Sequence, residues 1–61
     1  MHNGLLPKQL RREIFAALVD AQDEGVEVAA SRRVVAARFG VSEQDVRDIE
    51  REGSEKDWPP L

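Results

Sequence analysis

The sequence contains no cysteine and a single histidine among its 61 residues. Without cysteine there are no disulfides and no thiolate metal sites, and a reducing cytoplasm is the expected location. The histidine, His2, has no second histidine or cysteine with which to form a metal site or a nucleophile–base pair. A chain this short also has little room for a ligand pocket. The sequence therefore predicts no enzyme, no metal or other cofactor, and no small-molecule ligand.

Aromatic residues and long apolar runs are also scarce. Two phenylalanines and one tryptophan are too few for a platform on which the bases of single-stranded nucleic acid would stack. No apolar run is long enough to span a bilayer, and residues 1–7 lack the basic and apolar segments of a signal peptide. The four glycines are scattered, so there is no glycine-rich phosphate loop. We expect no membrane partner.

The charge balance argues against simple binding to a polyanion. Nine basic and twelve acidic residues give a net charge of −3, whereas affinity for nucleic acid normally comes from an excess of basic side chains. The distribution is uneven, however. Residues 28–42 contain three arginines and no acid, and a second basic cluster lies at residues 8–12. The acids are concentrated in residues 20–27 and 43–57.

Residues that favour helix starts and ends, together with the spacing of apolar residues, predict three helices. Pro7 suits a first helical turn and Gly25 a helix end, which predicts a helix over residues 7–24. Four apolar residues form one stripe along it: Leu10, Ile14, Leu18 and Ala21. The second helix ends at Phe39, and its start is left open between Val28 and Ser31. The third is predicted over residues 42–52, with Gly53 closing it.

The expected fold is all-α: a three-helix bundle at residues 7–53, between a flexible arm at residues 1–6 and a tail at residues 54–61. Pro59 and Pro60 prevent the tail from being helical throughout. Trp58 has two interpretations, a tail residue packed on the bundle or a contact for a partner. Because so short a chain needs nearly all of its apolar side chains in the core, we favour the first and expect the extended tail to pack on the bundle.

Residues 32–51 carry a local pattern of two helices joined by a tight turn. Ala36 is small enough for a close crossing of two helices, and Gly40, four residues later, can adopt a left-handed backbone. Ser42 is placed to cap the following helix, with Asp45 completing part of a capping box that prefers Glu or Gln. Apolar residues stand where the inner faces of both helices require them: Val35, Phe39, Val41, Val46 and Ile49.

This stretch, about a third of the chain, resembles the helix-turn-helix motif of small tri-helical bacterial DNA-binding proteins. The resemblance implies that the helix at residues 42–52 enters the major groove of double-stranded DNA. It also implies that the chain is a transcriptional regulator or a related accessory factor. Glutamine pairs with adenine and arginine with guanine, so the expected base contacts are Ser42, Gln44, Arg47 and Arg51. The expected phosphate contacts are the basic side chains Arg11, Arg12, Arg32 and Arg33.

A second interpretation is a protein-interaction module that keeps this scaffold and uses an acidic surface to bind a basic partner. The two differ in whether the arginines form one patch or are paired with acids. A homodimer or a larger protein partner is left open in either case, because a DNA-binding monomer with this charge would bind with modest affinity.

Overall fold

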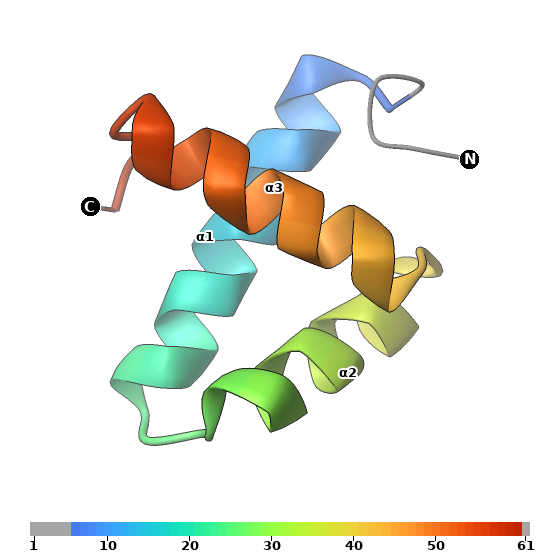
Figure 1. The fold of residues 1–61 in the computed structure, drawn as a ribbon, viewed down its shortest axis with the longest axis vertical. Coiled ribbons are helices and arrows are strands. Elements are labelled where there is room, and N and C mark those ends of the chain that lie inside the picture. Colours follow the sequence, from blue (N-terminus) through green and yellow to red (C-terminus); the bar gives the residue numbers. More distant parts are fainter. Residues whose placement is uncertain (1–5, 61) are drawn as a thin grey trace.

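The computed structural model describes residues 6–60, which form three α-helices and no strand (Figure 1). The helices are α1 (Lys8–Asp23), α2 (Val28–Phe39) and α3 (Glu43–Glu55). Each helix packs against the other two, and α3 crosses in front of α1 in Figure 1. The predicted all-α three-helix bundle is confirmed.

The helix boundaries follow local chemistry, with small departures from the prediction. Pro7 lies just before α1 rather than inside it, and its carbonyl accepts a hydrogen bond from the N–H of Arg11 at 3.0 Å. α2 begins at Val28, the earlier of its two open starts. Ser31 is therefore not a cap. It is buried within α2, and its hydroxyl donates to the Val28 carbonyl at 2.7 Å.

The prediction that Gly53 ends the third helix is wrong, because α3 continues through it to Glu55. The reason lies in α1: a Cβ atom placed on Gly53 would stand 2.6 Å from Cγ of Phe15. Two carbon atoms cannot approach so closely, so the glycine lets the Phe15 ring lie directly against the backbone of α3. This residue serves the packing of two helices and not the termination of one.

The core is built from all three helices and the tail. Its aliphatic centre lies between Ile14 and Leu18 of α1, Val35 of α2, and Val46 and Ile49 of α3, all at most 2% exposed. Leu10 and Ala21 of the predicted stripe are only half-buried. No helix in residues 6–60 combines the length and apolar character needed to cross a membrane.

The C-terminal tail contributes Trp58 to this core. Its side chain is 6% exposed and meets Phe15 edge to face, with 6.1 Å between ring centroids and 79° between ring planes. The backbone N–H of Trp58 donates to the backbone carbonyl of Gly53 at 2.9 Å. Of the two interpretations of Trp58, packing on the bundle agrees with this geometry.

The predicted N-terminal arm lies outside the described residues except for Leu6, and Leu61 of the tail lies outside them as well. Leu6 is half-buried against the core. Its carbonyl accepts a hydrogen bond from Nη1 of Arg11 at 2.6 Å. At this residue, the expected flexible arm is instead attached to the bundle.

Candidate nucleic-acid interface

The turn between α2 and α3 has the conformation that the sequence predicts. Gly40 adopts a left-handed backbone with φ 69° and ψ 34°. The N–H of Val41 returns to the carbonyl of Ala36 at 3.0 Å, which closes the end of α2. Ala36 is 5% exposed, so its small side chain belongs to the core.

The start of α3 is fixed by a complete capping box. The Ser42 hydroxyl accepts from the N–H of Asp45 at 2.9 Å, and the Asp45 carboxylate accepts from the N–H of Ser42 at 3.3 Å. Aspartate thus replaces the usual Glu or Gln without loss of either hydrogen bond. A helix with a fixed first turn presents its following side chains in a defined orientation.

Opposite faces of α3 have opposite chemistry. Val46 and Ile49 are fully buried, whereas Gln44, Arg47 and Arg51 are exposed. The exposed three are spaced by three and four residues, which places them on one face of the helix. Ser42, the N-cap residue, is exposed at the start of α3. Its oxygen accepts the capping hydrogen bond, and its hydroxyl proton can still be donated.

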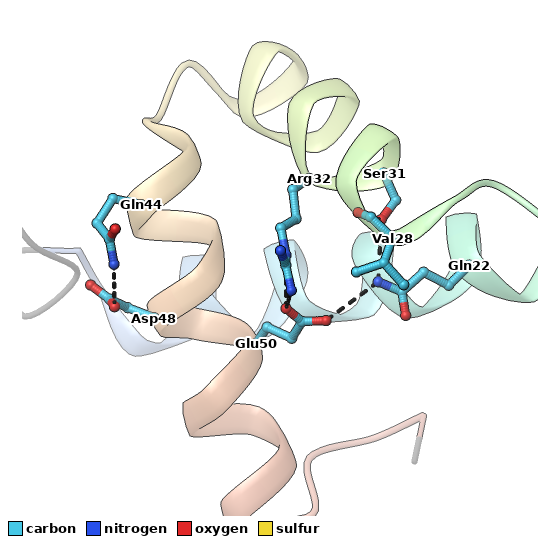
Figure 2. A network of polar contacts seen from close by, with 7 residues as sticks. All are labelled: Gln22, Val28, Ser31, Arg32, Gln44, Asp48 and Glu50. Carbon is cyan, nitrogen blue, oxygen red and sulfur yellow. Dashed lines mark hydrogen bonds and ion pairs between the residues drawn. The ribbon is translucent and has the colours of Figure 1, made fainter.

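Side chains on this face are joined to one another. Gln44 donates from Nε2 to Asp48 at 2.9 Å (Figure 2), and its Oε1 accepts from Nη2 of Arg47 at 2.8 Å. These bonds orient the Gln44 amide and bring a carboxylate among the predicted base contacts. Because Gln44 and Arg47 are exposed, exchanging these bonds for bonds to DNA costs little.

The four predicted phosphate contacts divide into two paired and two exposed arginines. Arg11 binds both carboxylate oxygens of Glu52, from Nε at 2.9 Å and Nη2 at 3.2 Å. Arg32 donates to Oε1 of Glu50 from Nε and Nη2, at 3.0 and 2.9 Å. The exposed pair is Arg12 and Arg33. The predicted phosphate role therefore has less support at Arg11 and Arg32, whose guanidinium groups already hold carboxylates.

Glu50 of α3 links all three helices, a role that the sequence analysis does not predict. Its carboxylate accepts from Arg32 of α2 and, at 3.4 Å, from Nε2 of Gln22 of α1 (Figure 2). Gln22 also donates to the Ser31 hydroxyl at 3.2 Å. The partners of Glu50 lie 18 and 28 residues away, so no local spacing pattern points to them.

The Arg11–Glu52 pair makes the stability of the fold depend on pH. Hydrogen bonds from Arg11 lower the pKa of Glu52 below its ordinary value of 4.5, with burial opposing and Lys56 assisting. A carboxyl whose pKa is lower in the folded state stabilises the fold above its unfolded-state pKa. That contribution is lost as the pH falls through the folded-state pKa.

We expect Glu52→Gln to lower the free energy of unfolding by about 1–2 kcal/mol at neutral pH, since it breaks a bidentate, partly buried pair. The difference from the parent should shrink as the pH falls below 4.5. Urea unfolding over a series of pH values measures it. Glu55→Gln, at an exposed position on the same helix, is the control. A stability difference that stays constant with pH would contradict the assignment.

A metal site is the other kind of functional site for which the described residues can be searched. Within residues 6–60, no cluster of three or more His, Cys, Asp or Glu side chains is arranged to hold a metal ion. Comparison of the chain with protein-family models, curated proteins and solved structures finds no match. The resemblance to helix-turn-helix proteins therefore rests on residues 32–51 and on the geometry described above.

Proposed function

We propose that this protein binds double-stranded DNA and places the exposed face of α3 in the major groove. The observation that carries the proposal is the division of α3, which buries Val46 and Ile49 and leaves Gln44, Arg47 and Arg51 exposed together. Amide and guanidinium groups are the side chains that pair bidentately with adenine and guanine. A transcriptional regulator or a related accessory factor is the role that fits such a module.

The surroundings of α3 support this orientation. Arg32 pairs with Glu50 of α3, so it lies on the side of α2 that faces α3. Arg33, the next residue, is exposed. Arg33 would contact a phosphate beside the groove and fix the orientation of α3, while α3 itself would contact the bases. The capping box holds the first turn of α3 in place during this contact.

The acids limit the affinity that one molecule can reach. Glu43 and Asp48 lie near the proposed contacts and repel phosphate, and Arg11 and Arg32 are neutralised by Glu52 and Glu50. Affinity per monomer would therefore be modest, and specificity would need dimerisation or a larger assembly. The same pairing is what a protein-interaction module would show, so that function remains the second candidate.

A titration of the isotopically labelled protein with random-sequence duplex at low and moderate salt separates the two candidates. We expect NMR shift changes at Arg33 and along residues 42–51, which weaken as salt rises because phosphate contacts release counterions. An absence of shift changes at low salt, where electrostatic attraction is strongest, would reject DNA binding. It would favour the protein-interaction module.

A selected duplex then tests the role of α3 itself. We expect Arg47→Ala to weaken binding by about tenfold or more, as the loss of a bidentate base contact does. Arg38→Ala removes the same charge from an exposed position on α2 and should change affinity by less than about threefold. Fluorescence anisotropy with the labelled duplex measures both. Equal losses for the two variants would show attraction by net charge alone and would remove the base-contact role of Arg47.

A further inference from the structure

A groove runs along the side of α1 that faces away from α3. It has a volume of about 700 Å³, and the end of α2 and the two prolines of the tail also line it. α1 meets α3 through Arg11, Phe15 and Gln22. At 3.6 residues per turn, the groove-lining positions of α1 lie on the opposite side of the helix. This groove is therefore a different surface from the proposed DNA-binding face.

The floor of the groove is small and apolar. Ala16 and Ala17 supply it from α1, Phe39 from α2, and Pro59 and Pro60 close one part of it. Alanine side chains allow a second helix to approach closely, since nothing larger separates the two backbones. The ring of Phe39 is only partly covered by its neighbours. A floor of this kind is complementary to the apolar side of an amphipathic helix.

The edge of the groove is acidic and regularly spaced. Glu13 and Asp20 both line it, seven residues apart on one face of α1, and both are exposed. Glu24 follows Asp20 by four residues and continues the same row past the end of α1. None of the three forms an ion pair with any residue in the described part of the chain, and Glu13 accepts one exposed hydrogen bond, from Nε2 of Gln9 at 3.1 Å. The row is free to pair with positive charges on another molecule.

One positive group, Arg38, stands among the described lining residues. Its guanidinium carbon lies 5.5 Å from the centroid of the Phe39 ring, on the α2 side of the groove. Arg38 forms no ion pair with Glu13 or Asp20, so the groove has an acidic edge on α1 and a basic edge on α2.

We propose that this groove docks an amphipathic helix of a partner protein that carries Lys or Arg residues seven positions apart. Glu13 and Asp20 are separated by about 10 Å along α1, which is the rise over seven residues of a helix lying alongside it. The small apolar residues of the partner would pack on Ala16, Ala17 and Phe39. Its basic residues would pair with Glu13 and Asp20, which fixes the register of the two helices.

Charge decides against two other occupants. A second copy docking through the same α1 face would bring Glu13 opposite Glu13 in parallel, or opposite Asp20 when antiparallel about Ala16 and Ala17. Like charges on α1 repel in both arrangements, and each copy offers one basic lining residue, Arg38, against two acids, so the face is poorly complementary to itself. DNA is disfavoured because its phosphates would meet the acidic row. The docking proposal stands independently of the proposed DNA binding.

Two libraries of helical peptides displayed on phage test the proposal against the full chain. They share one randomised apolar face, and one library carries Lys or Arg seven positions apart where the other carries Glu. We expect enrichment from the basic library alone. An enriched peptide should shift the NMR signals of residues 13–20 and Phe39 and leave residues 42–51 unchanged. Enrichment from both libraries or from neither, or shifts on the α3 face, would overturn the proposal.

Charge reversal locates the site. Glu13→Lys combined with Asp20→Lys should weaken binding of the enriched peptide by about tenfold or more, since two ion pairs become repulsions. Asp23→Lys combined with Glu55→Lys changes the net charge equally at exposed positions outside the groove and should cost less than about threefold. Equal losses in the two double variants would overturn the proposal.

Folding and self-association are checked with the same samples. Thermal melts by circular dichroism confirm that the variants are folded, and Asp20→Asn alone is the substitute if the double reversal unfolds the chain. Sedimentation of the parent and of the double reversal should show the same oligomeric state in the absence of peptide. Self-association that the reversal of Glu13 and Asp20 abolishes would show a second copy in the groove and reject the basic helix.

Discussion

Trp58→Ala is expected to lower the free energy of unfolding by about 3–5 kcal/mol, the usual cost of truncating a buried aromatic side chain. Trp58 is 6% exposed and covers Phe15, which is itself 1% exposed. Truncation therefore leaves a cavity and also uncovers the ring beneath. A domain of this length is stable by only about 3–9 kcal/mol, so the substitution should remove about a third of that stability or more.

Circular dichroism melts and urea titrations measure this effect without relying on tryptophan fluorescence. Trp58→Phe is the matched control, because a smaller ring keeps most of the aromatic contact and should recover most of the loss. The other interpretation of Trp58, as a partner contact, makes a different prediction. An unchanged melt together with the loss of a dimer would support that interpretation and contradict the packing role.

Gly53→Ala is expected to destabilise the protein although alanine is the better helix former. The substitution gains up to about 1 kcal/mol in helix propensity. Against this, the new Cβ would lie 2.6 Å from Cγ of Phe15, whose ring is enclosed and cannot move aside. Overpacking of this kind costs about 1–3 kcal/mol or more, so the clash outweighs the gain. The midpoint of thermal unfolding should fall by about 4–8 °C for each net kcal/mol.

The neighbouring residue gives the control for this prediction. Ser54 is exposed in the same helical turn, so Ser54→Ala gains helix propensity without a clash and should raise stability by a few tenths of a kcal/mol, roughly. Phe15→Leu combined with Gly53→Ala should cost less than the sum of the single changes, because the smaller side chain relieves the contact. If Gly53→Ala raises the melting temperature as Ser54→Ala does, the close approach of α1 and α3 is not what requires glycine.

Local features of the candidate site were predictable because they depend on neighbours in the chain. The left-handed turn at Gly40 follows from glycine after an apolar helix end. The capping box follows from the three-residue spacing of Ser42 and Asp45. The two faces of α3 follow from its helical period, which separates Val46 and Ile49 from Gln44, Arg47 and Arg51.

The pairing of the arginines was not predictable from spacing. Arg11 and Glu52 are 41 residues apart, and Arg32 and Glu50 are 18 apart. Each arginine was an equally good candidate for a phosphate contact or an internal ion pair until the helices were placed. The same holds for the groove: Ala16 and Phe39 belong to different helices, and only their packing brings them to one surface.

Three helices, the turn at Gly40 and the capped start of α3 follow from the amino-acid sequence alone, because backbone propensity, capping and periodicity act within a few residues. Which charged groups form ion pairs depends on how the helices pack. Packing places Arg11 and Arg32 in ion pairs and extends α3 beyond Gly53. It leaves Glu13 and Asp20 without ion pairs beside an apolar groove. A charge or a glycine acquires its role from the side chains that face it, and those side chains come from other helices.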